Sequence, residues 1–264
     1  MSLTNKTFAS YYKNIVGVFK TANTGITSSP QGLRDGAGNK SCIALSDDVL
    51  YIQPQNDNTL ETLRVVNQSG SAVLKVDTTN SKVLAGASQV AVNTQYAYFG
   101  VSSLTGLSAV AGTHYLIPFG NTWATTAAIA FGTGTNPSTS YDVSANNNGD
   151  DLTVCLWYVP DNITIDQVYL LAGGNAASGD TINIHLLSFD FDAGAGAGKG
   201  DLSNGIVVAG GADIASLGYE NVIYQSTAPS SADVDAGKVI VATFESNGTN
   251  SDYACQIVTK YHIR

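Results

Sequence analysis

Three pairs of closely spaced carboxylates are the residues of this sequence best suited to catalysis. The pairs are Asp150 with Asp151, Asp190 with Asp192, and Asp233 with Asp235. Two carboxylates on either side of a glycosidic bond can act as general acid and as base or nucleophile, so these pairs would suit a polysaccharide-degrading enzyme. Each pair lies at the end of a strand-like run or in a Gly-, Asn- and Ser-rich loop, where carboxylates are usually solvated. We therefore expect no enzyme activity and no catalytic residue, with the polysaccharide-degrading enzyme kept as an alternative.

Metal ligands are the second chemistry to consider. Clustered loop oxygens favour Ca²⁺, and Asp190 with Asp192 is the best candidate pair, against the simpler interpretation that both are solvated. The histidines His114, His185 and His262 have no metal-ligand spacing and no neighbouring nucleophile. We expect these histidines to be structural, and we expect no bound cofactor.

The cysteines do not form a disulfide framework or a zinc motif. Cys42, Cys155 and Cys255 are an odd number, and no two of them have CxxC spacing. Cys155 lies in LTVCLWYV (152–159) and Cys255 in YACQIV (253–258), both of which read as strands. We expect both thiols to be free and buried, with a disulfide between them as the alternative, and we expect synthesis in a reducing cytoplasm.

The Gly-rich segment FDAGAGAGKGD (191–201) invites a nucleotide-binding interpretation. A phosphate-binding Walker loop needs a glycine five residues before its Gly-Lys pair and a serine or threonine after it. Here those positions hold Ala193 and Gly200, and no helix or βαβ pattern follows. This segment is therefore expected to be a flexible loop between strands.

Charge argues against nucleic acid as a partner. The net charge of the 264 residues is −9, with +2 over residues 1–82 and −11 over 83–264. Such a surface repels phosphate backbones, although acidic excess also simply favours solubility. No apolar run approaches the roughly 18 residues of a membrane-spanning helix, and MSLTNKTFASYYKN lacks a signal-peptide pattern. We expect no membrane insertion.

Residues 1–20 have the periodicity of an amphipathic helix. Phe8, Tyr12, Ile15 and Phe19 recur at spacings of four, three and four residues, which places them on one helical face. This aromatic stripe must be buried somewhere. Its burial on another protein would make residues 1–20 an attachment helix, and its burial within the same oligomer is the alternative.

Residues 21–95 predict a β-rich segment with few large side chains. Leu63–Val66 and Ala72–Val76 read as strands, and NQSG (67–70) and DTTNSK (77–82) read as turns. From Thr24 to Thr94 the only aromatic residue is Tyr51. A segment of this kind buries too little surface to offset chain entropy as a monomer, and its open strand edges invite pairing. We expect several copies to intertwine, with a trimer preferred and a dimer still open.

Residues 96–264 predict a self-sufficient antiparallel β-sandwich, with jelly roll as the preferred arrangement. About nine strand-like runs are separated by turn residues, and we expect no helix. The runs are 114–120, 126–132, 152–159, 163–173, 181–191, 205–211, 221–226, 238–245 and 253–263. Aromatic residues in its loops, Trp123, Tyr141 and Tyr219, would either stack on sugars or cover the ends of the sandwich.

These segments resemble structural proteins of tailed bacteriophages, especially marine ones. The resemblance is carried by TFASYYKNIVG, by DGAGNKSCIALSDDVLYIQP, by LRVVNQSGSAVLKVDTTNSKVLAG, and by LWYVPDNITIDQVYLLAGGNAASGDTINIHLLSFDFD with GDLSNGIVVAGG. It covers nearly the whole chain, and its repeated elements are turns and strands that contain no catalytic residue. The family is that of tail fibres and other appendages of the virion.

The resemblance implies a trimeric, non-enzymatic component of a phage particle. It would have an N-terminal attachment element that contacts other virion proteins, an intertwined stem, and a β-rich head for contact with a glycan or protein of the host surface. Such a protein is made in the host bacterial cytoplasm and resides in the virion. A tail fibre, a head fibre, and a capsid-decorating or cement protein that stabilises the phage head all remain open.

Overall fold

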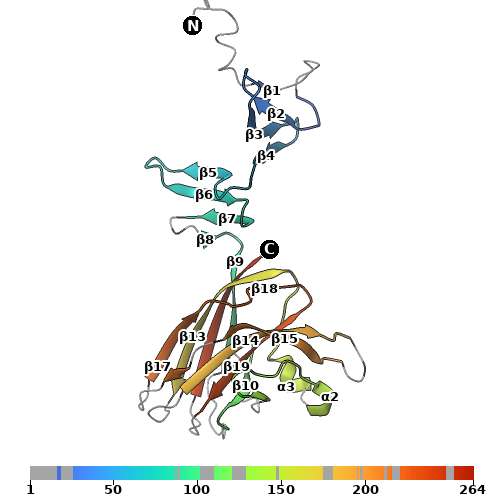
Figure 1. The fold of residues 1–264 in the computed structure, drawn as a ribbon, viewed down its shortest axis with the longest axis vertical. Coiled ribbons are helices and arrows are strands. Elements are labelled where there is room, and N and C mark those ends of the chain that lie inside the picture. Colours follow the sequence, from blue (N-terminus) through green and yellow to red (C-terminus); the bar gives the residue numbers. More distant parts are fainter. Residues whose placement is uncertain are drawn as a thin grey trace, which may run out of the picture. The chain divides into compact units, whose positions relative to one another are not determined.

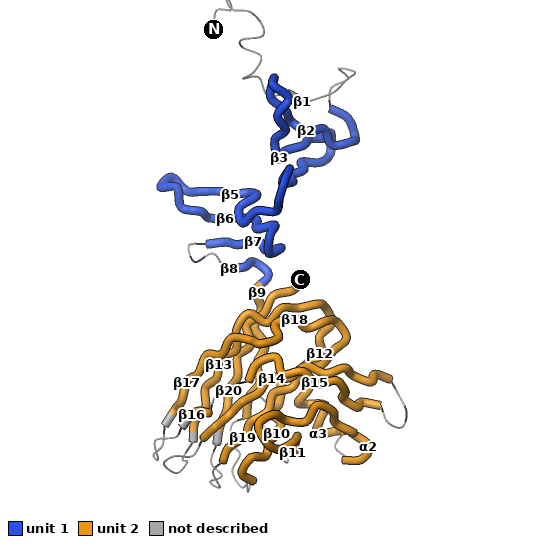
Figure 2. Tube along the Cα trace, viewed as in Figure 1, with its two compact units in different colours: residues 1–93 blue, residues 94–264 orange. Residues whose placement is uncertain are grey.

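The computed structural model divides the chain into two compact units, residues 1–93 and residues 94–264 (Figure 2). We call them unit 1 and unit 2. Both are built mainly from antiparallel strands, as expected, and the described residues of unit 2 include two short helices (Figure 1). The structure describes residues 17–18, 26–86, 88, 90–101, 110–120, 129–146, 149–174, 181–194, 196, 199–210, 213–215, 221–247 and 253–264.

Unit 1 contains two separate four-stranded sheets, each a simple antiparallel meander. The first comprises β1 (Gly17–Val18), β2 (Gln31–Arg34), β3 (Lys40–Leu45) and β4 (Leu50–Ile52). The second comprises β5 (Leu63–Val66), β6 (Ala72–Asp77), β7 (Lys82–Ala85) and β8 (Val90–Ala91). The two strands predicted here are confirmed, the second extending one residue further.

Polar side chains close the turns of the second sheet. Between β5 and β6, the Asn67 side-chain oxygen accepts hydrogen bonds from the Ser71 amide at 2.9 Å and from the Ser69 hydroxyl at 2.7 Å. Between β6 and β7, Asp77 accepts from the backbone and side-chain nitrogens of Asn80 at 2.9 and 2.8 Å. Bonds of this kind replace the backbone partners that a reversing chain loses, so the polar residues fix both turns.

Unit 2 consists of two antiparallel sheets that share a core. The five-stranded sheet has the order β17-β13-β20-β9, with β18 beside β13. The seven-stranded sheet has the order β11-β10-β19-β14-β15, with β12 beside β19 and β16 beside β14. The first sheet contains β9 (Thr94–Val101), β13 (Ile163–Gly174), β17 (Asn221–Thr227), β18 (Asp233–Val234) and β20 (Tyr253–Ile263). The second contains β10 (Thr113–Ile117), β11 (Ala130–Thr133), β12 (Trp157–Tyr158), β14 (Thr181–Phe191), β15 (Leu202–Gly210), β16 (Ile214–Ala215) and β19 (Val239–Ser246).

The central strands β14 and β19 of the seven-stranded sheet are buried on both faces. Its inner face packs against the five-stranded sheet in a core that includes Phe99, Leu186 and Phe244. Its outer face packs in a second core that includes Phe131 and Phe189, whose rings meet edge to face at 5.6 Å. This burial explains why β14 and β19 contain continuous apolar runs, whereas a half-exposed strand alternates.

The expectation that residues 96–264 contain no helix is wrong. The structure contains α2 (Val143–Asn146) and α3 (Gly149–Thr153), and the predicted strand over 152–159 shrinks to β12. Leu152 in α3 and Cys155 in the turn after it are both buried in the second core, and the Cys155 amide donates to the Leu152 carbonyl at 2.8 Å, which continues the helical turn. The apolar run was therefore assigned the wrong period.

Most of the predicted attachment helix, including Phe8, Tyr12, Ile15 and Phe19, lies outside the described residues. Where the structure does describe this segment, the helix is contradicted. Gly17 and Val18 form β1 and pair with Arg34 and Leu33 of β2.

Candidate functional site

Unit 1 lacks a hydrophobic core among its described residues. Only one of them is buried, and that residue is Asp77, whose carboxylate closes a turn. Hydrogen bonds from Asn80 lower the pKa of this carboxyl group. Every apolar side chain of residues 26–86, 88 and 90–93 keeps part of its surface in water. A unit of eight strands normally obtains its stability from apolar burial, which the described residues of unit 1 do not provide within the single chain.

The β5–β8 sheet presents one wholly apolar face. Strand pairing places Leu63 opposite Val76 and Val83, and Val65 opposite Leu74, Ala85 and Val90. Because side chains alternate along each strand, these residues share one side of the sheet. We call this set the apolar face: Leu63, Val65, Leu74, Val76, Val83, Ala85 and Val90. Val65 and Val90 are each 45% exposed and Val83 is 41% exposed.

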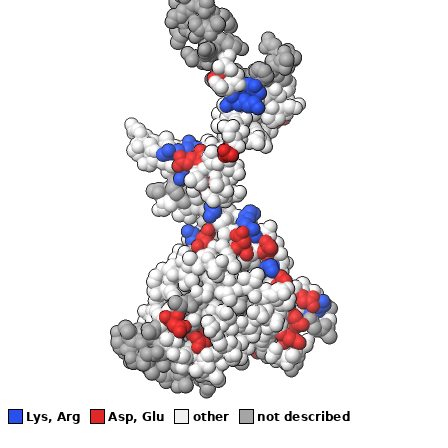
Figure 3. All heavy atoms as spheres, in the orientation of Figure 1, with Lys and Arg blue, Asp and Glu red and all other residues white. Residues whose placement is uncertain are grey.

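The opposite face of the same sheet is charged. Glu61 lies 3.4 Å from both Arg64 and Lys75, and the Arg64 guanidinium also donates to the Gly70 carbonyl. Figure 3 shows charged atoms of both signs gathered over this sheet. Exposed ion pairs of this kind contribute little stability, but they mark the face that remains in water. The sheet is therefore amphipathic, and its apolar side is the candidate assembly surface.

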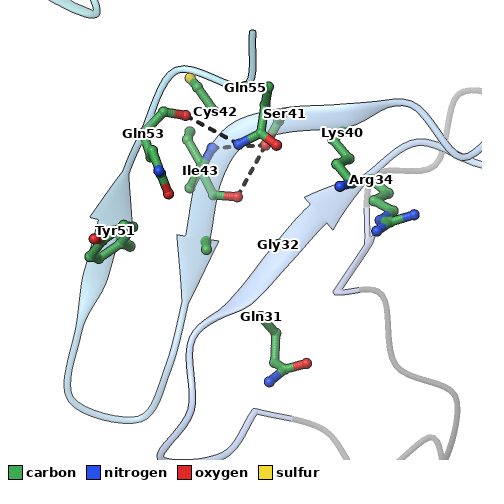
Figure 4. A pocket seen from close by; sticks show the side chains of 11 residues that line it. Gln31, Gly32, Arg34, Lys40, Ser41, Cys42, Ile43, Tyr51, Gln53 and Gln55 are labelled. Atoms are coloured by element: carbon green, nitrogen blue, oxygen red, sulfur yellow. Dashed lines mark hydrogen bonds between the residues drawn. The ribbon is translucent and has the colours of Figure 1, made fainter. Parts of the chain in front are cut away.

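The β1–β4 sheet carries a shallow groove of about 430 Å³. Two small residues that are cross-strand partners, Gly32 and Ala44, belong to its lining. Figure 4 shows the side chains around the groove. Arg34 and Lys40, also cross-strand partners, line one part, and three glutamines line the groove elsewhere. Its lining contains no carboxylate, so the groove could accept an anionic or hydrogen-bonding group.

The structure separates the two predicted calcium ligands. The Asp190 carboxylate accepts hydrogen bonds from the Lys238 ammonium and from the Asn204 amide, which lower the pKa of that carboxyl group. Asp192 instead pairs with Lys199 at 2.7 Å. Each carboxylate thus has its own lysine. Within the described ranges, no group of three or more His, Cys, Asp or Glu residues is arranged to hold a metal ion.

The other two carboxylate pairs also have structural surroundings, and one pair shares an arginine. Arg264 donates to Asp233 at 3.3 Å and to Asp235 at 2.9 Å, and the Thr164 hydroxyl donates to Asp233 at 2.6 Å. Both aspartates and Lys238 line an open hollow of about 580 Å³. The third pair, Asp150 with Asp151, lies in the first turn of α3.

Two histidines that are far apart in the sequence lie together. His114 on β10 and His185 on β14 flank β19, and their buried rings meet edge to face with centroids 5.0 Å apart. The His114 Nε2 lies 2.9 Å from the Gly134 carbonyl oxygen, whereas the His185 Nδ1 has no partner among the described residues. Burial, and secondarily His114, lower the pKa of His185 to about 4. Sequence spacing could not reveal this pair because strand register creates it.

The remaining predicted residues have structural surroundings. His262 is buried, and its Nδ1 lies 3.0 Å from Asp166. Cys155 and Cys255 are free and buried, as expected, and burial raises the pKa of each thiol to about 12. Cys42 is free and exposed.

Of the three loop aromatics, Tyr141 is buried and stacks on Phe131 at 4.9 Å, so it covers the core as the simpler interpretation held. Trp123 and Tyr219 lie outside the described residues. Exposed aromatic side chains occur instead on strands, at Tyr96 and Tyr98 of β9 and at Tyr224 of β17. The alternation in YAYFG would have located the first two.

Comparisons with known proteins identify no family. No family model matches this chain, and no curated protein matches it. A similar solved structure is a CocE/NonD family hydrolase from Staphylococcus aureus, with 8% sequence identity and a TM-score of 0.32. The match covers 69% of this chain and 39% of the hydrolase, so the chain spans well under half of that protein. A likeness this weak carries no argument about function. No helix in the described part of the chain is long and apolar enough to cross a membrane.

Proposed function

We propose that this protein is a non-enzymatic structural subunit of a bacteriophage virion, a tail- or head-fibre-type appendage. In this proposal unit 1 is an intertwined, oligomerising stem, and unit 2 is a jelly-roll-like head for contact with the host surface. The resemblance of the chain's turn and strand motifs to phage appendage proteins supports the assignment. The absence of a core from the described part of unit 1 is the single observation that carries it.

The apolar face supplies the energetic reason for assembly. Fully burying one valine stabilises a structure by about 1.5–3 kcal/mol relative to leaving it exposed. Val65, Val83 and Val90 are each more than two-fifths exposed in the single chain, so much of this stabilisation is still unrealised. Packing against copies of the same face would realise it and would exclude water from the whole set. An identical partner is favoured because it is always present at the same concentration as the chain.

A homotrimer is the arrangement we propose for the stem. Three apolar faces turned toward a common axis would form a closed three-sided stem, in which Val, Leu and Ala side chains fill a narrow centre. The charged faces, with Arg64, Lys75 and Glu61, would then remain in water. Two faces packed as a sandwich would make a dimer, which the experiment below distinguishes.

The N-terminal part would join the appendage to the particle. Phe8, Tyr12, Ile15 and Phe19 would contact other virion proteins, and the protein would reside in the virion. The head would be held away from the particle by the stem. Three heads on one stem would bind a repetitive surface with greater avidity than a single head.

Light scattering on the purified chain tests the oligomer. The expected molar mass is about three times 27.4 kDa, and a chain that begins at Asn93 should be monomeric because unit 2 retains its own core. A full-length monomer at micromolar concentration would refute the stem. Gold labelling of the C-terminus on intact particles then distinguishes an appendage from a protein lying flat on the capsid.

A further inference from the structure

The outer face of the five-stranded sheet in unit 2 is rich in exposed tyrosine. The inner sides of β9, β13 and β20 contribute Phe99, Leu170 and Ile257 to the core. Alternation therefore turns their neighbours outward. Together with the outer side chains of β17, these form what we call the tyrosine face, with Tyr96, Tyr98, Tyr169, Tyr224, Gln167 and Gln256 as its principal members.

Strand register brings the tyrosines together. Tyr98 pairs with Val258, which pairs with Tyr169, so one row across the sheet carries two rings. Tyr224 lies in the adjacent row, where Leu171 of β13 separates it from Gln256 of β20. Tyr96, Tyr98 and Tyr224 are 50%, 43% and 62% exposed, which is unusual for a set of aromatic residues sharing one face.

The spacing of these tyrosines suits an extended ligand. Tyr96 and Tyr98 are two residues apart on one strand, which separates their attachment points by about 7 Å. Tyr98 and Tyr169 are separated by one intervening strand, which gives about 10 Å. Several rings at these distances form a row of platforms on a surface without a deep pocket. A chain of linked rings could lie across more than one platform at once.

Hydrogen-bonding groups are interspersed among the rings. Gln167 and Lys260 occupy the row of Tyr96, Gln256 occupies the row of Tyr224, and Ser226 occupies the row of Tyr169. A surface that packs against a protein copy usually has an apolar centre and a polar rim. On the tyrosine face the central strands carry Gln256 and Lys260 together with the apolar Val258 and Leu171, so polar groups reach the centre and are not confined to the rim. The apolar face of unit 1, by contrast, contains no polar side chain, so the two exposed sheet faces differ in composition.

The charge of this face is unlike that of the unit that carries it. Unit 2 contains 15 acidic and four basic residues, yet none of the paired outer positions in these rows is acidic. Lys260 is the one charged residue among them, whereas the next row of the same sheet face carries Asp233, and Asp166 lies in the β13 bulge beside Gln167. The three rows therefore offer no carboxylate to a basic partner. An uncharged partner can bind them without meeting the acidic excess of the rest of unit 2.

We infer that the tyrosine face binds an uncharged oligosaccharide. The C–H groups of one side of a pyranose ring are weakly positive and pack on the negative face of a tyrosine ring. The sugar hydroxyls then exchange hydrogen bonds with the glutamine amides, the Ser226 hydroxyl and the tyrosine hydroxyls. This inference rests on the proposed function for its biological setting, a host-surface glycan, but its chemistry depends on unit 2 alone.

Binding of the purified full-length chain to an array of neutral and acidic oligosaccharides tests the inference. Wild type is compared with Tyr98→Ala and Tyr169→Ala, and with Tyr158→Ala as the matched control. Tyr158 is 54% exposed but belongs to β12 of the other sheet. We expect at least one neutral glycan to bind, each face variant to weaken that binding about tenfold or more, and the control to leave it unchanged.

Light scattering on the same samples separates the outcomes. Loss of glycan binding with an unchanged oligomer mass supports the inference. Binding of no neutral glycan, or equal loss in all three variants, overturns it without affecting the proposed stem. A fall in oligomer mass in Tyr98→Ala and Tyr169→Ala without any glycan effect would make the face an interface between copies and would also overturn it. Far-UV circular dichroism confirms that each variant is folded.

Discussion

Replacing Val65 with aspartate should dissociate the oligomer, whereas the same replacement at Val66 should not. The two residues are neighbours on β5 and are almost equally exposed, at 45% and 46%. Because they are consecutive in a strand, they point to opposite sides of the sheet. Val65 belongs to the apolar face, and Val66 lies on the charged side with Arg64. Side-chain type, exposure and strand are thus matched, whereas the face differs, as does the register, which shifts between the two residues.

The magnitude follows from burial and desolvation. Burying the exposed 45% of Val65 is worth about 1 kcal/mol per chain, taking about 1.5–3 kcal/mol for a whole valine. A carboxylate in its place must lose part of its hydration, which costs at least about 2 kcal/mol more. Three copies make the total about 9 kcal/mol per trimer, or about six orders of magnitude in the association constant. Val66→Asp adds a carboxylate to a solvated face and should change the association by less than about 1 kcal/mol per chain.

Light scattering across a range of micromolar concentrations is the assay. Val65→Asp should have the mass of one chain, and Val66→Asp should keep the mass of the wild type. Unit 2 should melt at the same temperature in both variants, since its cores contain no residue of the β5–β8 sheet. A trimer that survives Val65→Asp would refute the assembly surface. Equal dissociation by both variants would show that the effect is general destabilisation of the sheet.

Four further predictions concern other parts of the chain. Burial lowers the pKa of His185 to about 4 from an ordinary value near 6.5, so as the pH falls the unfolded state is protonated before the folded state. The free energy of unfolding should be constant above about pH 6.5 and fall by up to about 3 kcal/mol toward pH 4. Burial raises the pKa of the neighbouring Glu245 carboxyl, and this opposite shift offsets part of the fall. Urea unfolding at several pH values measures this fall, and a flat profile would contradict it. Phe244→Ala, at a fully buried position, should destabilise unit 2 by about 3–5 kcal/mol in the same assay, and a loss under 1 kcal/mol would mean that the core there is not closed. Millimolar Ca²⁺ should leave the melting temperature unchanged, because the Asp190 and Asp192 carboxylates bind separate lysines; a rise that Asp190→Asn abolishes would restore the calcium site. Deletion of residues 1–20 should abolish incorporation into particles while unit 2 stays folded, and incorporation of the truncated chain would end the attachment hypothesis.

Local patterns in the sequence predicted much of the fold. The strand at 181–191 coincides with β14, and the strand at 253–263 coincides with β20. Polar or small residues flank both strands, and such residues end a strand through their local turn preferences. The prediction of a strand at 152–159 was wrong because Leu152 lies in the five-residue helix α3 and Cys155 in the turn that follows it, and so short a helix leaves no periodic pattern in the sequence.

The surfaces could be predicted less well because they depend on register. The proximity of His114 to His185, and of Tyr98 to Tyr169, arises from pairing between strands that are tens of residues apart. A shift of one residue in any of these pairings would turn the rings to the other side of the sheet. The lack of a core in the described part of unit 1, by contrast, could be predicted from composition, because residues 21–95 contain too few large apolar side chains to fill one.

The two exposed sheet faces differ in a way that matches the partner we propose for each. A surface that assembles with identical copies gains most from complete exclusion of water, and the apolar face, from Leu63 to Val90, contains no group that would need hydration. A surface that binds and releases a hydrated ligand needs polar groups that water can satisfy when the ligand is absent. Gln167, Gln256 and the tyrosine hydroxyls meet that need, so the tyrosine face can remain exposed without driving association. The Val65→Asp monomer should therefore retain the glycan affinity of a single face and lose only the avidity that three faces provide.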